Sequence, residues 1–254
     1  MKEGFQFNGM TISALFFTDD LVLISRTKRR GMNRLLRAVQ QFCTEMDMKL
    51  AVEKTVILSY GTNQNSWRVS DSDPDFEAAL VAKYLGVDIS VQGRNLIKPR
   101  ESKMIGSARA YAHTIMGCTC WGLDRSLTAS KLWEVCAIPQ FLYGTEAMVI
   151  SKSTVRELEK IQHSVASFIL QLPQSSFQVM GWMEAGLKPI QMRLDERAVL
   201  FAHHLLTKKN DILSKTVAQA TLSDMTDSWT KRIKSLQIEL GIPDLTQISK
   251  AKLK

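Results

Sequence analysis

Hydrophobic and polar residues follow different patterns in the first 90 residues and in the rest of the chain. Short β-prone runs separated by turn residues fill the N-terminal part, and Asn8-Gly9, between the first two runs, is a strong hairpin signal. From about residue 98 onward, apolar residues recur at the three- and four-residue steps of helices. The pattern predicts an α+β fold in which antiparallel strands with a packed helix precede a mostly α-helical region. The β-prone runs are residues 5–7, 11–17, 21–24, 56–59, 67–69 and 84–89.

A long helix is expected within the strand-rich part, over residues 29–46. At 100° per residue, its apolar side chains fall within about 60° of one direction, and Arg30, Arg34 and Arg37 cluster about the opposite one. The helix should therefore bury one face and expose its arginines. The apolar positions are Leu35, Leu36, Val39, Phe42, Cys43 and Met46.

The C-terminal part carries signals for helix ends. Thr154 and Glu157 have the spacing of a capping box before an apolar stripe, and Pro189 suits the first turn of another helix. Gly241 follows the apolar positions of a last helix and should end it.

Two adjacent carboxylates, Asp19 and Asp20, stand between apolar runs. Together with Thr18 they form a segment short enough for a tight turn between antiparallel strands. A buried carboxylate is costly unless it is hydrogen-bonded or binds a cation, and Mg²⁺ prefers carboxylate oxygens. The segment is therefore either part of a divalent-metal site or an exposed hairpin turn, in which Asp is common.

Three short motifs follow one another along the chain. They are Phe17-Thr18-Asp19-Asp20, the stretch MKLAVEKTVIL at residues 48–58 with its Lys54-Thr55 pair, and Tyr84-Leu85-Gly86-Val87. In this order they resemble the second half of the palm of a reverse transcriptase from non-LTR (LINE-type) retrotransposons. They are similar to its aromatic-Ala-Asp-Asp motif, its Lys-Thr stretch and its primer-grip hairpin. LYGTE at residues 142–146 and GWMEAGLKPIQ at residues 181–191 resemble segments downstream of the polymerase, so the resemblance covers about residues 4–205.

This resemblance implies an RNA-directed DNA polymerase, a nucleotidyltransferase that uses Mg²⁺ (or Mn²⁺), with an RNA template and a DNA primer as partners. It makes Asp19 a ligand of the two catalytic metal ions and Asp20 its weaker neighbour. Phe17 would lie near the primer terminus. The primer grip, which binds nucleic acid, would include Tyr84, Leu85 and Gly86.

The resemblance also implies a role for Lys54, which would assist the leaving pyrophosphate electrostatically or as a general acid. A solvated surface lysine is the alternative. Two residues depart from the family pattern, because Thr18 stands where Ala is usual and Ala51 where Asn is usual. Both departures are consistent with a copy that has drifted.

The resemblance implies three segments: a partial palm at residues 1–90, a helical thumb and post-thumb region at residues 91–207, and a basic helical C-terminal segment at residues 208–254. A palm of this kind needs a further metal-binding Asp from an upstream motif, together with fingers. Glu3 is the sole acidic residue before Asp19, and it is too close along the first hairpin to imitate a separate palm strand. We expect the chain alone not to polymerise DNA. Either another polypeptide supplies the upstream half or the chain is a truncated copy of an element, and the second is favoured.

The net charge of the chain indicates which class of partner it binds. The chain has 33 Lys and Arg against 25 Asp and Glu, a net charge of +8, which favours a polyanion such as nucleic acid. The face with Arg30, Arg34 and Arg37 would bind phosphates or would simply be solvated. The four cysteines have no metal-site spacing. The sequence shows neither a signal peptide nor a stretch of about 18 apolar residues, which predicts an intracellular protein, nuclear or cytoplasmic, with no membrane partner.

Three hypotheses follow. The first is a fragment of a LINE-type reverse transcriptase that is inactive alone. The second is a nucleic-acid-binding or interaction protein that retains the fold without the chemistry. The third is a basic globular protein whose Asp-Asp turn is incidental.

Overall fold

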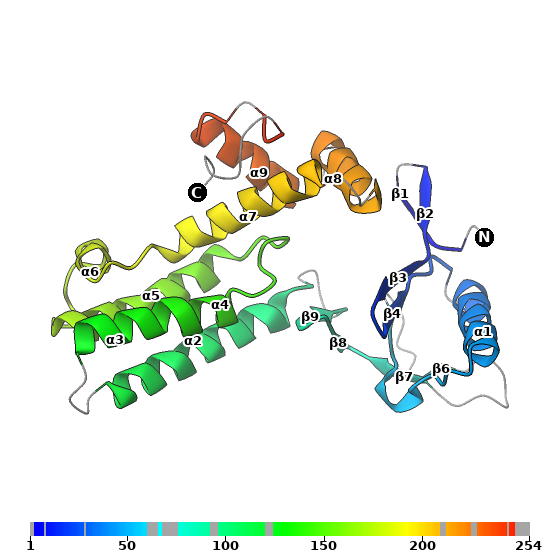
Figure 1. The fold of residues 1–254 in the computed structure, drawn as a ribbon, viewed down its shortest axis with the longest axis horizontal. Coiled ribbons are helices and arrows are strands. Elements are labelled where there is room, and N and C mark those ends of the chain that lie inside the picture. The colour runs from blue at the N-terminus through cyan, green and yellow to red at the C-terminus, as the bar shows by residue number, and fades with distance from the viewer. Residues whose placement is uncertain are drawn as a thin grey trace. The chain divides into compact units, whose positions relative to one another are not determined.

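The computed structural model describes residues 3–7, 9–27, 29–59, 66–67, 76–91, 96–119, 124–208, 212–224, 228–242 and 244–246. The chain divides into two compact units, Met1–Leu96 (unit 1) and Ile97–Lys254 (unit 2). Unit 1 combines small sheets with one long helix, and unit 2 is mostly helical (Figure 1). The prediction of a mixed α+β chain with strands first and helices afterwards is therefore confirmed.

Unit 1 begins with two antiparallel hairpins. Strand β1 (Phe5–Phe7) pairs with β2 (Met10–Ile12), and Gly9 between them has a φ of 79°, which glycine adopts without strain. Strand β3 (Ala14–Phe17) pairs with β4 (Asp20–Leu23) in a separate sheet. The run predicted at residues 11–17 is thus divided at Ser13 between two sheets.

The helix predicted at residues 29–46 is confirmed as α1 (Arg29–Glu45). A 3-10 turn, η1 (Val52–Lys54), then leads into β5 (Val56–Leu58). Strand β5 runs parallel to β7 (Phe76–Ala79), which also pairs with the short β6 (Ser66–Trp67).

A last hairpin in unit 1 joins β8 (Val81–Tyr84) to β9 (Val87–Ser90). The prediction of one strand over residues 84–89 is therefore wrong. Leu85 and Gly86 both have positive φ, 47° and 82°, which reverses the chain in a two-residue hairpin turn. The hairpin implied by the resemblance is present at these residues.

The core of unit 1 is small. Leu36 of α1, Ile57 of β5 and Phe76 of β7 form its buried cluster. Leu23 of β4 and Val52 of η1 pack against this cluster. It covers only the first half of the apolar face of α1, because Phe42 and Met46 are 46% and 59% exposed.

Unit 2 is built on two long parallel helices, α2 (Lys98–Cys118) and α5 (Lys152–Leu170), which pack along each other. Its main core includes Trp133, Phe141 and Met104, which are fully buried. A second cluster joins α7 to α8 and α9. The remaining elements are α3 (Arg125–Leu132), the π-helical turn η2 (Trp133–Ala137), α4 (Ile138–Phe141), α6 (Gln178–Glu184), α7 (Ile190–Thr207), α8 (Ile212–Asp224) and α9 (Ser228–Glu239).

The predicted helix ends are close to those observed. Helix α9 ends before Gly241, whose φ is 63°, as predicted. Pro189 is the N-cap of α7, directly before the first turn. The prediction of a capping box that begins at Thr154 is wrong by one turn. Ser151 is the N-cap of α5, and its Oγ accepts the Thr154 N–H at 3.3 Å. Among the described helices, none is both long and apolar enough to cross a membrane.

Candidate metal site

The two candidate carboxylates lie at the tip of the β3–β4 hairpin. The strands pair in the register Leu15↔Val22, Phe16↔Leu21 and Phe17↔Asp20. Thr18 and Asp19 therefore form a two-residue turn, and the tight turn predicted from the sequence is confirmed. Thr18 has a φ of 52°, a left-handed conformation that costs a β-branched residue about 1–3 kcal/mol.

Both carboxylates are exposed, and so are the aromatic side chains before them. Phe16 is 71% exposed and Phe17 is 58% exposed. In the part of the chain that the structure describes, the side chains of Asp19 and Asp20 have no hydrogen bond or ion pair. The hairpin thus presents two unpaired carboxylates to solvent, beside apolar surface that the unit does not bury.

Two exposed carboxylates fit one corner of a Mg²⁺ or Mn²⁺ site, because such ions take one or two protein carboxylates and complete their shell with waters and phosphates. Within the described residues no group of three or more His, Cys, Asp and Glu side chains is placed to hold a metal ion. The residues present therefore fit a weak, open site rather than a closed structural one.

Glu3 has a different environment. Its Oε1 accepts a hydrogen bond from Arg34 Nη1 at 2.6 Å and its Oε2 accepts one from Thr27 Oγ1 at 2.9 Å. A Cβ on Gly31 would lie 2.6 Å from Glu3 Oε2, so glycine is needed for this carboxylate to approach the first turn of α1. Glu3 is therefore bound at the start of α1, where a negative charge interacts favourably with the helix dipole.

The arginine face of α1 is exposed as the helical wheel predicted, at Arg30, Arg34 and Arg37. Arg34 is 65% exposed and forms the ion pair with Glu3. For Arg30 and Arg37 no partner is found within the described ranges. Sequence reasoning missed the Glu3–Arg34 pair, because the two residues are 31 positions apart and no periodicity relates them.

Lys54 ends the η1 turn and is exposed. Its neighbour Thr55 donates a hydrogen bond to the Ala51 carbonyl at 2.9 Å, which fixes this turn. Val52 of the same turn packs on the cluster that also contacts Leu23 of β4. The core thus packs both the turn that contains Lys54 and the strand that begins with Asp20 against α1. No hydrogen bond or ion pair joins the described side chains of Lys54 and Asp20.

The residues of the third motif lie in the β8–β9 turn. Tyr84 and Leu85 are half-buried, and Gly86 is exposed. Strand β8 packs beside β5, which follows Lys54 along the chain. The turn therefore belongs to the same small unit as the Asp19 hairpin but to a different sheet.

The backbone carbonyls of the segment at residues 142–146 accept hydrogen bonds from several helices. The Leu142 carbonyl accepts from Arg197 Nη1 at 3.0 Å, and the Tyr143 carbonyl accepts from Arg100 Nη2 at 2.6 Å. The Glu146 carbonyl accepts from Trp229 Nε1 at 2.8 Å. These bonds tie α2, α7 and α9 to one loop, a structural role that the sequence did not reveal.

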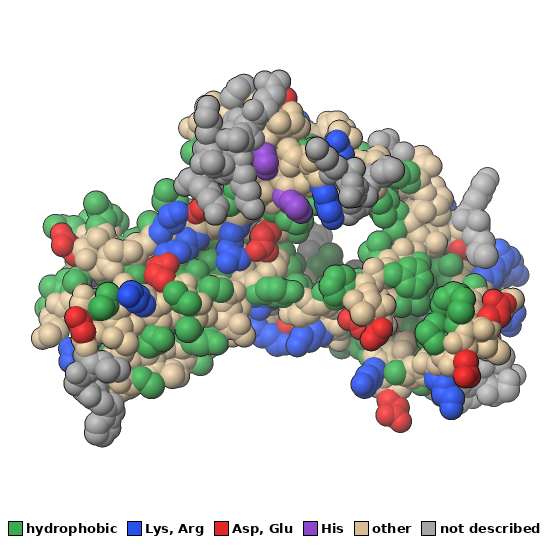
Figure 2. Space-filling view, viewed as in Figure 1, with side chains coloured by type: hydrophobic (Ala, Val, Ile, Leu, Met, Phe, Trp, Pro, Cys, Tyr) green, Lys and Arg blue, Asp and Glu red, His purple; other side chains and the backbone are tan. Residues whose placement is uncertain are grey.

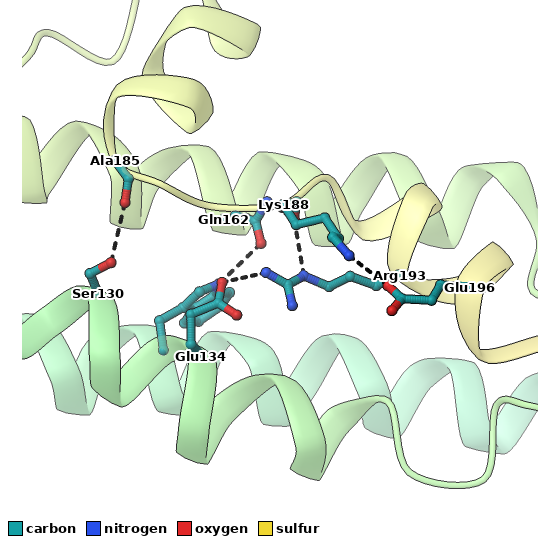
Figure 3. Close-up of polar contacts among 8 residues, drawn as sticks. Ser130, Glu134, Gln162, Ala185, Lys188, Arg193 and Glu196 are labelled. Atoms are coloured by element: carbon teal, nitrogen blue, oxygen red, sulfur yellow. Dashed lines mark hydrogen bonds and ion pairs between the residues drawn. The ribbon is translucent and has the colours of Figure 1, made fainter. Parts of the chain in front are cut away.

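The segment at residues 181–191 is tied down in a similar way (Figure 3). The Lys188 carbonyl accepts hydrogen bonds from Gln162 Nε2 at 3.2 Å and from Arg193 Nε at 3.0 Å. Arg193 also pairs with Glu134, and Lys188 Nζ pairs with Glu196 at 2.6 Å. Both downstream segments therefore hold helices together within unit 2.

Comparison of the chain with models of protein families, with curated proteins and with solved structures found no match. The resemblance to LINE-type reverse transcriptases therefore stays a prediction. It depends on the three motifs in residues 17–20, 48–58 and 84–87 and on the hairpins and turns in which they lie.

Proposed function

We propose that unit 1 carries the catalytic hairpin of a reverse transcriptase palm of the LINE type, with Asp19 as a metal ligand and Asp20 as its weaker neighbour. The observation that supports this proposal most strongly is the β3–β4 hairpin, which presents both carboxylates, unpaired, at an exposed two-residue turn. An incidental hairpin turn favours residues that tolerate positive φ, such as Asn, Asp or Gly. This turn has Thr18, a β-branched residue, at its positive-φ position.

In nucleotidyl transfer, divalent metal ions activate the primer 3′-hydroxyl and stabilise the leaving pyrophosphate. The chain's own contribution is to position charge and apolar surface. Asp19 and Asp20 supply anionic oxygens at the hairpin tip, and the exposed ring of Phe17 offers a surface on which a terminal nucleotide stacks. Lys54, exposed on a turn packed against the same core, supplies positive charge for a phosphate group.

We also propose that this site is incomplete in the chain as given. The described residues contribute two carboxylates, and Glu3 is already bound to Arg34 and Thr27. A further carboxylate would come from another polypeptide segment that packs on the exposed apolar side chain of Phe16. Primer extension with Mg²⁺, an RNA template and dNTPs should therefore give no product with this chain alone.

The decisive test is Mn²⁺ binding to the full chain, measured by electron paramagnetic resonance. Asp19→Asn keeps the side-chain shape and removes one charge, so we expect affinity to fall by roughly fivefold or more. Glu53→Gln is the matched control, because Glu53 is exposed in the same unit but lies outside the hairpin. Equal affinity in the wild-type chain and Asp19→Asn would contradict the proposal.

The alternative hypothesis, a non-catalytic protein that retains this fold, predicts a different result. It would bind RNA in a salt-dependent manner, and Mn²⁺ binding would not depend on Asp19. Measuring both properties on the same preparation separates the two functions.

A further inference from the structure

The net positive charge of the chain belongs almost entirely to unit 2. Unit 1 contains 12 Lys and Arg and 11 Asp and Glu, whereas unit 2 contains 21 and 14. On the face of unit 1 that Figure 2 shows, blue and red side chains are interspersed. The arginine face of α1 therefore belongs to a nearly neutral unit, and an attraction for polyanions should come from the helices of unit 2.

At least four of the 14 acidic side chains of unit 2 are engaged within the unit. Glu134 pairs with Arg193, Glu146 with Arg197 and Asp195 with Arg232, and all six side chains are at most 31% exposed. Glu101 is buried and accepts the Ser151 N–H at 2.6 Å. These four carboxylates are therefore already engaged and do not neutralise cations on the outer faces.

One such face lies along α5. Lys152, Arg156 and Lys160 are spaced four residues apart and are all exposed, so they form a line about 12 Å long at 1.5 Å per residue. The α5 segment that carries them also exposes Ser153 but no large apolar side chain. This line of cations is therefore a polar, solvent-facing surface.

Helix α2 extends this face. It runs parallel to α5, and Arg109, which is 59% exposed, reaches Glu157 of α5 at 3.5 Å. Lys98 lies three helical turns before Arg109, in nearly the same direction from the helix axis, and is also exposed. We call this surface the α2–α5 basic face, and it consists of Lys98, Arg109, Lys152, Arg156 and Lys160.

Two acidic residues lie next to this face. Glu157 accepts a hydrogen bond from Lys160 at 2.8 Å, and this bond lowers the pKa of the carboxyl, so it stays ionised and neutralises one cation. Glu159 is partly buried, which raises its pKa, and the backbone N–H of Gln191 on α7 partly opposes this shift. With five cations and these two acids, the face keeps an excess of positive charge.

We propose that the α2–α5 basic face binds the phosphate backbone of a nucleic acid. At one phosphate per about 3.4 Å of each strand, a line of about 12 Å spans three or four phosphates. Arg109 and Arg156 add guanidinium groups, which form paired hydrogen bonds with phosphate oxygens. A lipid surface suits this face less, because helices that bind membranes carry large apolar side chains beside the cations. The inference does not rest on Asp19 and Asp20 and stands if they bind no metal.

The test uses the full chain and fluorescence anisotropy with a short labelled single-stranded RNA and a DNA duplex, over a range of KCl concentrations. The combined variant Lys152→Gln, Arg156→Gln and Lys160→Gln should weaken binding roughly tenfold and make the salt slope shallower by about 2. The matched control is Lys131→Gln, Lys215→Gln and Lys231→Gln, which removes the same charge from α3, α8 and α9. We expect less than about a twofold change in the control.

Several outcomes would overturn the proposal. Equal weakening by both combined variants would show that binding depends on net charge rather than on this face. Failure of the wild-type chain to bind either nucleic acid, or binding to phosphatidylserine vesicles in its place, would contradict it directly. Circular dichroism melting of both combined variants checks that each retains the fold. The combined variant of Lys152, Arg156 and Lys160 should keep the Mn²⁺ affinity of the wild-type chain, so failure here is distinguishable from failure of the metal site.

Discussion

The two units differ in how much of their apolar surface they bury. Among the described residues, unit 1 has four buried hydrophobic side chains against ten large exposed ones, whereas unit 2 has twenty-nine against twelve. Each fully buried large side chain contributes about 1.5–3 kcal/mol. Unit 2 is therefore stabilised by its own core, and unit 1 has a thin core with apolar surface left open around its candidate site.

Polar groups show the same contrast. In unit 2, arginines on α7 and α9 bind carboxylates and loop carbonyls from distant parts of the chain. In unit 1, the side chains of Asp19, Asp20 and Lys54 have no hydrogen bond or ion pair within the described residues. Unit 1 thus leaves both apolar and charged side chains of its candidate site exposed, and the difference from unit 2 can be tested by mutation.

The largest effect should come from the core of unit 2. Trp133 is fully buried and donates a hydrogen bond from Nε1 to Gln162 at 3.1 Å, so Trp133→Ala should cost about 3–5 kcal/mol of unfolding free energy. In unit 1, Phe42→Ala should cost less than about 1 kcal/mol, because the ring is 46% exposed. Urea unfolding followed by circular dichroism measures both. Similar costs for the two variants would mean that the apolar face of α1 is covered after all.

A smaller effect is expected from the ion pairs. Arg232 pairs with Asp195 at 2.7 Å, with side chains only 14% and 23% exposed, so Arg232→Ala should cost about 2 kcal/mol. Arg34 pairs with Glu3 at a similar distance but is 65% exposed, and solvent screening should keep the cost of Arg34→Ala below about 1 kcal/mol. Thermal unfolding at low and high salt checks both values. If Arg34→Ala is the more damaging variant, the start of α1 depends on Glu3 more than exposure suggests.

The smallest effect concerns the hairpin turn. Glycine adopts the φ of 52° found at Thr18 without steric strain, so Thr18→Gly should stabilise the chain by about 1 kcal/mol. The control Thr11→Gly, in the regular strand β2, should instead destabilise it by a similar amount. Differential scanning calorimetry resolves the sign. Destabilisation by Thr18→Gly would show that the hydroxyl or methyl group of Thr18 has a structural role.

Much of the fold follows from local patterns in the sequence. The period of the apolar positions predicted α1 within one residue at its C-terminus, and the Thr18-Asp19 turn followed from its length between two apolar runs. The apolar pattern alone missed the turn at Leu85-Gly86, which only the resemblance implied, because Leu rarely adopts positive φ and the run appeared continuous. Local patterns failed where the decisive partner was distant in the chain.

The candidate site shows this limit most clearly. The positions of Asp19 and Asp20 on a turn could be predicted, but their exposure could not, because it depends on how little of unit 1 packs around them. The engagement of Glu3 by Arg34 depends on Gly31, whose missing side chain lets the carboxylate approach. The use of acidic residues inside unit 2, which determines where the positive charge is exposed, likewise depends on tertiary contacts.

Loops are usually the segments in which a protein tolerates insertions and in which proteases first cut. The loop at residues 142–146 should behave in the opposite way. Its carbonyls accept hydrogen bonds from Arg100, Arg197 and Trp229, the last of which is 83 positions away. One inserted residue would shift these acceptors away from their donors on three helices. In an insertion scan or a limited proteolysis experiment, this loop should be as intolerant as the middle of a core helix.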